Sequence, residues 1–389
     1  MLREFDRDLA SLFALNLLMA FSVQLINPLF PLYLEGLGAS DVEVGLVVSL
    51  SSVVATALML PSGILMDWVG RRRMLILSVL LCAAPPFLLV FVRSWWMALP
   101  LSMVFAASFS LFVPTRMTLI ADSARPGSTA TLFGLMNLAW PIGGIAAPIL
   151  SGLIVERFGW GSCFLLAGGI LAVSLIPALL IRAPRRRVRG VAERSSSPLA
   201  RSHLVPLLLF FIFHLVMTTA MGCLGVILPL YLKDQFGLPY PIIGLFFTAS
   251  GAMTLITQIP SGYLADRYGE RRFISIVITP IPLLLGLWPL MRQWWMLLLL
   301  YTFISGLWSM TWPATLSLLS ETFPEELRGT AFGVRMTGVR MGFTIGPVIA
   351  GYLYGGWSSS APFQAASLLT LLGIPLSLTL PRGRNNSHC

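Results

Sequence analysis

Long apolar stretches alternate with short polar segments along the whole chain. Each stretch has about the twenty residues that an α-helix needs to cross a bilayer core. Hydrocarbon offers no partner to free backbone N–H and C=O groups, and the alternation of a barrel strand is absent. The pattern therefore predicts an all-α membrane protein with twelve transmembrane helices. They are expected over residues 9–34, 41–66, 74–92, 95–121, 129–155, 160–182, 204–232, 239–265, 273–291, 294–320, 328–355 and 360–380.

The chain repeats itself at a shift of about 199 residues. "PSGILMD" at 61–67 falls on "PSGYLAD" at 260–266, and further matches keep this register through six spans. We expect an N-terminal six-helix bundle over 1–182, a cytoplasmic linker over 183–203 and a C-terminal bundle over 204–389. Two parallel repeats of this kind form a substrate site between them, near the middle of the bilayer. The two repeats rock against each other about this site.

Composition and charge support the membrane assignment. The chain is 56% hydrophobic and only 11% charged, against about a quarter in soluble proteins. Its net charge of +10 does not indicate nucleic-acid binding, because most of the 26 Lys and Arg residues lie in loops on one side. The opposite loops hold only Arg93, Arg157, Lys233 and Arg292. The positive-inside rule places both termini in the cytoplasm, in a plasma membrane protein.

One motif occurs in both halves, each time between the second and third span. It reads GILMDWVGRRR at 63–73 and GYLADRYGERR at 262–272. The two copies resemble the signature of the major facilitator superfamily (MFS), which implies the MFS fold with two pseudo-symmetric six-helix bundles. The resemblance implies a cytoplasmic gate that contains Gly63, Asp67, Gly70, Arg71, Asp122, Gly262, Asp266 and Gly269.

The resemblance also implies how this gate works. Asp67 would face the start of the eleventh span near Arg328, where a helix N-terminus favours a carboxylate by about 0.3–2 kcal/mol. Arg71 would pair with Asp122, and together they would hold the cytoplasmic side closed. In a simpler interpretation the arginines only set the topology. The second copy has Glu270 in place of the arginine, so a pairing with Glu321 is expected to be lost.

The fifth span resembles the antiporter signature of MFS drug exporters, and the eleventh span carries the same pattern. Small residues at this spacing let helices approach closely, and proline bends a helix. Because the pattern is duplicated, it is equally a packing seam of the fold. Its residues are Gly134, Gly143, Pro148, Gly152, Gly342, Gly346 and Pro347.

Polar residues within the spans are the candidates for a substrate cavity. No acidic residue is central in a span, so His214 is the one titratable group there with a pKa suited to proton transfer. The alternatives are a hydrogen-bonded interior role for His214 and protonation of Asp67 or Asp122 at the cytoplasmic rim. Arg116 and Arg335 could snorkel to the surface or join the gate, whereas Arg340 is deep enough to select an anionic substrate. The predicted cavity residues are Asn16, Gln24, Asn27, Arg116, Asn137, His214 and Arg340.

These features predict a secondary transporter that exports drug-like amphipathic molecules by alternating access, in exchange for protons. The alternative is a transporter of small organic anions or metabolites without proton antiport. An enzyme is not expected, because no cluster of nucleophiles, paired carboxylates or metal ligands occurs, and no glycine-rich phosphate loop indicates ATP. We expect no metal, no cofactor and no nucleic acid, and a monomer whose partners are the lipid bilayer, the substrate and protons.

Overall fold

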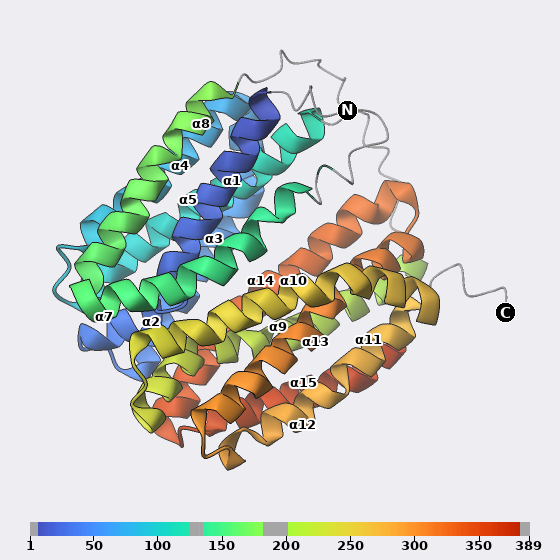
Figure 1. Cartoon of the computed structure of the whole chain (residues 1–389). Helices are drawn as coiled ribbons and strands as arrows, with labels where there is room; N and C mark the ends of the chain where they lie inside the picture. Colours follow the sequence, from blue (N-terminus) through green and yellow to red (C-terminus); the bar gives the residue numbers. More distant parts are fainter. Residues whose placement is uncertain (1–6, 124–131, 133–134, 182–200, 382–389) are drawn as a thin grey trace. The chain divides into compact units, whose positions relative to one another are not determined.

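The computed structural model describes residues 7–123, 132, 135–181 and 201–381 of the chain (Figure 1). Its regular elements are helices, and no strand occurs in this described part. The first half contains α1 (Arg7–Ile26), α2 (Phe30–Gly36), α3 (Asp41–Val69), α4 (Arg71–Leu89), α5 (Trp95–Ser123), α7 (Ala139–Val173) and α8 (Leu175–Leu180). The second half contains α9 (Arg201–Phe236), α10 (Tyr240–Tyr268), α11 (Glu270–Ile278), α12 (Pro280–Gly286), the short 3₁₀ helix η1 (Trp288–Leu290), α13 (Trp294–Thr322), α14 (Glu325–Gly356) and α15 (Ala361–Thr379).

Local sequence explains where several helices begin and end. Helix α3 begins at a capping box, in which the Ser40 hydroxyl accepts from the Glu43 N–H and the Glu43 carboxylate accepts from the Ser40 N–H. A single glycine separates α3 from α4, and another separates α10 from α11. Gly70 and Gly269 have φ of +89° and +80°, a conformation that only glycine adopts without strain. These two motif glycines therefore form the tight turns between the paired helices.

Nine helical segments within the described residues are long and apolar enough to cross a membrane. Twelve spans were predicted, and three features of the helices explain why only nine segments meet this criterion. The fifth and sixth spans merge into one long segment, although Gly159 interrupts α7 with a φ of 78° and a ψ of 172°. The ninth span is divided into α11 and α12, where Pro280 follows Thr279. Helix α14 carries Arg335 and Arg340, which lower its hydropathy.

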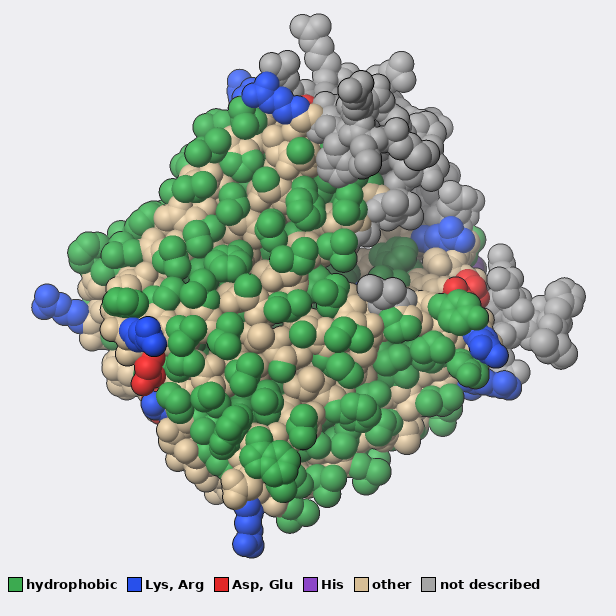
Figure 2. Space-filling view, in the orientation of Figure 1, with side chains coloured by type: hydrophobic (Ala, Val, Ile, Leu, Met, Phe, Trp, Pro, Cys, Tyr) green, Lys and Arg blue, Asp and Glu red, His purple; other side chains and the backbone are tan. Residues whose placement is uncertain are grey.

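The surface has the character expected of a protein that faces lipid. Hydrophobic side chains cover most of the face seen in Figure 2, and charged side chains lie at its margins. Large apolar side chains such as Phe91, Ile176, Leu283 and Leu299 are more than half exposed. In water such a surface would cause association, whereas in a bilayer it is favourable.

The helices form two compact units. Unit 1 is Met1–Arg186 with Pro229–Gly251, and unit 2 is Arg187–Leu228 with Ala252–Cys389. The predicted boundaries at 182 and 204 remain a prediction, because residues 182–200 lie outside the described part.

Unit 1 is built around α1. This helix packs against α7 and α8, while α5 packs against α3 and α4. Leu15, Met19, Val79, Phe112 and Leu171 belong to one buried cluster that joins α1, α4, α5 and α7. At Gly143 of α7, an added Cβ would lie 3.0 Å from the backbone of α1, so the two helices touch there through glycine.

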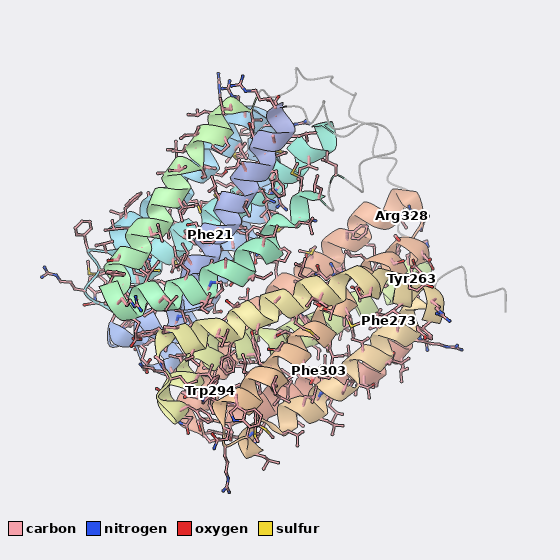
Figure 3. The ribbon with its side chains drawn as sticks, in the orientation of Figure 1. Phe21, Tyr263, Phe273, Trp294, Phe303 and Arg328 are labelled. Carbon is pink, nitrogen blue, oxygen red and sulfur yellow. The ribbon has the colours of Figure 1, made fainter. Side chains whose placement is uncertain are left out.

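In unit 2, α14 packs along α9 in the same manner. The Thr218 hydroxyl donates to the Val339 carbonyl at 3.1 Å, and a Cβ on Gly346 would lie 2.5 Å from the Thr219 carbonyl oxygen. Arg328, at the start of α14, lies at the same end of the unit as Tyr263 of α10 (Figure 3). Trp294, at the start of α13, lies at the opposite end, so α13 begins where α14 finishes.

The contact at Gly346 can be tested by adding one methyl group. Gly346→Ala should destabilise the protein by about 1–3 kcal/mol, because the new Cβ would collide with the backbone of α9. The measurement is the melting temperature of the purified protein in detergent. Gly333→Ala, on the same helix with no atom within 4 Å of the added Cβ, is the control and should not lower it. Equal melting temperatures for both variants would contradict the packing described here.

Candidate functional site

A buried arginine organises a polar junction in unit 1. Arg116 of α5 is only 3% exposed, and its Nη1 donates to Oδ1 of Asn16 in α1 at 2.5 Å. Its Nη2 donates to Oδ1 of Asn137 at 3.4 Å, and Asn16 in turn donates to the Met136 carbonyl. The structure therefore brings together three of the predicted cavity residues. Because Asn16 has no exposed surface, this junction fixes the position of α1 within the unit.

Unit 2 contains a second buried arginine, and it is only 2% exposed. Arg335 of α14 donates from Nε to Nε2 of His214 in α9 at 2.9 Å, and from Nη2 to the Thr315 hydroxyl at 3.4 Å. Its guanidinium lies 4.8 Å from the centre of the Trp312 ring, a distance at which the ring attracts a cation. Three helices, α9, α13 and α14, therefore meet at this side chain.

The hydrogen bonds of His214 specify its protonation. Nε2 accepts from Arg335, so Nδ1 carries the proton and donates to the Phe210 carbonyl at 2.8 Å. A second proton on Nε2 would remove the acceptor and place two cations against each other. This arrangement agrees with the interior, hydrogen-bonded role for His214 and gives no support to proton transfer through it.

The two junctions occupy equivalent places in the internal repeat. Asn16 and His214 correspond at a shift of 198 residues, and Arg116 and Thr315 correspond at a shift of 199. Arg335 corresponds to Met136, whose carbonyl takes part in the first junction. The arginine thus comes from α5 in one half and from the later helix α14 in the other.

The snorkelling interpretation of Arg116 and Arg335 is wrong. Both guanidinium groups are buried inside their own units, where neighbouring helices supply their acceptors. In the alignment of the two halves, Asn16 corresponds to His214. This correspondence could have predicted two equivalent junctions. Only the partner distances show that each arginine points inward.

The remaining predicted cavity residues take part in neither of these junctions. Gln24 is half-buried in α1, and Asn27 is exposed just beyond its end. Arg340 of α14 is half-buried. Within the residues that the structure describes, its guanidinium has no hydrogen bond and no ion pair, unlike Arg116 and Arg335.

The first copy of the gate motif lies at the junction of α3 and α4. Asp67 lies in the last turn of α3, and Asp122 lies in the last turn of α5. The side chains of both acids fall outside the described part, so their pairing with Arg71 and with the eleventh span remains a prediction. Gly134 of the packing motif also lies outside the described residues, whereas Pro148 and Gly152 are buried in α7.

The second copy of the gate motif lies at the junction of α10 and α11. Glu270, at the start of α11, is 5% exposed and accepts a hydrogen bond from the Ser317 hydroxyl at 3.1 Å. The carboxyl group of Glu321 in α13 lies close to that of Glu270, and Asp266 adds negative charge nearby. In the second copy of the motif, acidic groups therefore lie together where an arginine–acid pair would otherwise be.

Comparison with known proteins decides the family. The model of the Major Facilitator Superfamily matches residues 12–218 and again residues 210–388, which together cover nearly the whole chain. The chain belongs to the major facilitator superfamily. The fold predicted from the motif is thereby confirmed, and the protein is a multi-pass membrane protein of a family of transporters.

Several characterised MFS proteins are similar to the chain over most of its length. The multi-drug resistance efflux pump PmrA of Streptococcus pneumoniae is 27% identical over 377 residues, covering 91% of this chain and 90% of PmrA. The multidrug resistance protein MdtG of Serratia proteamaculans is 24% identical and covers 90% of the chain and 88% of MdtG. The quinolone resistance protein NorA of Staphylococcus aureus is 24% identical, with coverages of 93% and 94%.

Solved MFS structures confirm the fold. The nucleoside transporter NupG superposes with a TM-score of 0.78 at 14% identity and covers 96% of this chain and 98% of its own. A bacterial homologue of the lysosomal transporter Spinster has a TM-score of 0.75 at 15% identity, with coverages of 96% and 93%.

The role of His214 in the MFS fold of this chain can be tested with two substitutions. His214→Leu leaves Arg335 Nε buried without an acceptor, which should cost about 1–3 kcal/mol of stability. His214→Asn introduces the residue of the equivalent position in the first half, which can still accept from Arg335 and should retain most of the stability. Melting temperatures in detergent provide the comparison. A His214→Asn variant that folds but loses the pH dependence of transport would instead identify the imidazole as a proton carrier.

Proposed function

We propose that this MFS protein is a secondary active transporter that exports amphipathic, drug-like molecules in exchange for protons. The observation that carries the proposal is the similarity to PmrA, MdtG and NorA over about nine-tenths of the chain. Each of those proteins is named for drug resistance. The absence of acids from the span centres is consistent with apolar or amphipathic cargo.

The site of proton coupling is proposed to be the carboxyl pair of Glu270 and Glu321. No acidic residue lies near the middle of a span, where a proton relay of an antiporter is usually found. Glu321 lies close to Glu270 and Asp266, and the Ser317 hydroxyl donates to Glu270. Two negative charges at this place would repel each other, so we link uptake and release of a proton here to the packing of α11 on α13.

A second candidate function rests on Arg340. A half-buried guanidinium without a protein partner in the described residues is a suitable ligand for a carboxylate or phosphate group. This observation favours transport of small organic anions. The two functions differ in the charge of the substrate, so one assay separates them.

We further propose that the protein acts as a monomer in a plasma membrane with both termini in the cytoplasm. The uneven distribution of Lys and Arg between the two sets of loops supports this orientation.

The substrate class is tested in proteoliposomes with an imposed pH gradient. The protein should move a lipophilic cationic dye such as ethidium in the direction opposite to the proton flow. Arg340→Ala should leave dye transport within about twofold of wild type, because a cation needs no guanidinium for its binding. Organic anions are assayed in parallel, with Arg340→Lys as the charge-preserving control. Transport of anions alone, abolished in Arg340→Ala and retained in part by Arg340→Lys, would overturn the drug-export proposal in favour of the second candidate.

Proton coupling is tested at the carboxyl pair. Glu321→Gln keeps the size of the side chain but cannot exchange a proton, so dye transport should lose most of its pH dependence. Ser317→Ala is the control, since it removes a neighbouring hydrogen bond and leaves both carboxyl groups in place. The measurement is the initial rate of transport against pH in proteoliposomes. An unchanged pH profile in Glu321→Gln would rule out coupling through this pair.

A further inference from the structure

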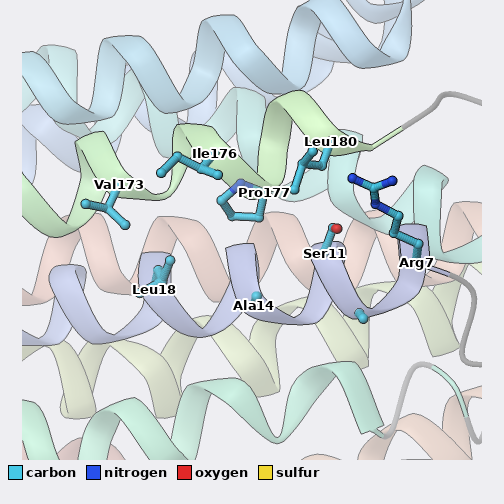
Figure 4. A pocket seen from close by; sticks show the side chains of 9 residues that line it. Arg7, Ser11, Ala14, Leu18, Val173, Ile176, Pro177 and Leu180 are labelled. Atoms are coloured by element: carbon cyan, nitrogen blue, oxygen red, sulfur yellow. The ribbon is translucent and has the colours of Figure 1, made fainter.

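A groove with a volume of about 380 Å³ lies in unit 1 between α1 and the end of the sixth span. Figure 4 shows its two walls. Ala14 and Leu18 line it from α1, and Val173, Ile176 and Leu180 line it from α7 and α8. Apart from Ser11 and Arg7 at one end, the lining is apolar.

The local sequence explains why the two helices do not close on each other. Between Arg7 and Leu18, the α1 wall is made of small residues, Ala10, Ser11 and Ala14. On the other wall, Pro177 has no N–H to donate to the Val173 carbonyl, and α7 ends at Val173 before α8 begins. The small side chains and the break between α7 and α8 leave a furrow that larger residues would fill.

The groove opens on the outside of the unit. Val173, Ile176 and Leu180 are 52%, 59% and 41% exposed, so the apolar wall is accessible to surrounding lipid. From Arg7 to Leu18 the groove follows α1 for about 16 Å at 1.5 Å per residue. This length matches one leaflet of a hydrocarbon core about 30 Å thick. The dimensions therefore suit one acyl chain of a single leaflet.

The charged end of the groove determines which lipid fits. Arg7 extends from α1 toward Leu180 (Figure 4). It is exposed, and its guanidinium has no hydrogen bond and no ion pair with the residues that the structure describes. Arg72 of α4 lies at the same end, where its Nη2 donates to the Leu179 carbonyl at 2.8 Å. Arg7 therefore lies where the headgroup of a lipid in the groove would be, and Arg72 lies near the same end of α8.

We propose that this groove is a binding site for an anionic phospholipid of the leaflet on the basic side of the membrane. One acyl chain lies between α1 and α8, and the headgroup phosphate binds Arg7, with Arg72 nearby. The proposal does not depend on the transported substrate, because the groove faces outward from unit 1 and involves none of the junction or gate residues. A bound lipid would stabilise the packing of α1 against α8 at the Arg7 end of α1.

The experiment is native mass spectrometry of the purified full-length protein with added phosphatidylglycerol or phosphatidylcholine of identical acyl chains. The wild-type protein should retain phosphatidylglycerol at least about fivefold more strongly, the factor expected for one arginine beside an anionic lipid. Arg7→Gln should remove this preference. Ala14→Trp should weaken the binding of both lipids, because the indole would occupy the groove. Both residues are exposed, so the variants should fold, and their melting temperatures verify this.

Arg93→Gln is the matched control, because it removes the same charge from an exposed position at the other end of unit 1 and should retain the preference. Three results would overturn the proposal. They are equal retention of the two lipids by the wild type, the same loss in Arg93→Gln as in Arg7→Gln, and unchanged lipid binding in Ala14→Trp. Displacement of the lipid by ethidium at the same groove would assign the site to substrate and also overturn it.

Discussion

Hydrocarbon supplies no hydrogen-bond partner, so the backbone and the buried polar side chains within the spans rely on partners that the protein itself supplies. The backbone meets this requirement by forming helices. The side chains meet it at two buried junctions, where Arg116 and Arg335 find acceptors on neighbouring helices. A charged group in such a place links the helices that surround it, because separating them would leave the charge unpaired in an apolar medium.

The internal repeat shows that the position of a polar junction is retained while the residue that supplies the charge changes. In unit 1 the arginine comes from α5 and meets Asn16 of α1. In unit 2 the equivalent place in α13 holds Thr315, and the arginine comes from α14 to meet His214. The gate motif shows the same divergence, since Glu270 takes the place of an arginine and accepts a hydrogen bond from Ser317. The two halves therefore share a scaffold but differ in their chemistry.

This divergence bears on how the halves contribute to transport. The first half carries the arginine-containing copy of the gate motif. The second half has Glu270 and Glu321 close together at the corresponding place, together with Arg340, whose charge no described residue neutralises. The charged groups available to a transport cycle therefore differ between the halves.

The sequence by itself determined the helical membrane architecture, the internal duplication and the family motif. Apolar length, charge distribution and repeat register are properties of the linear chain, and the bilayer constrains their interpretation strongly. The tight turns at Gly70 and Gly269 were predictable for the same reason, since they depend on local backbone conformation. Only the tertiary structure decided that Arg116 and Arg335 point into their units, that Glu270 meets Glu321, and that α1 and α8 leave a groove. Each of these depends on which faces of distant helices meet, and residue spacing along one helix does not specify its neighbour.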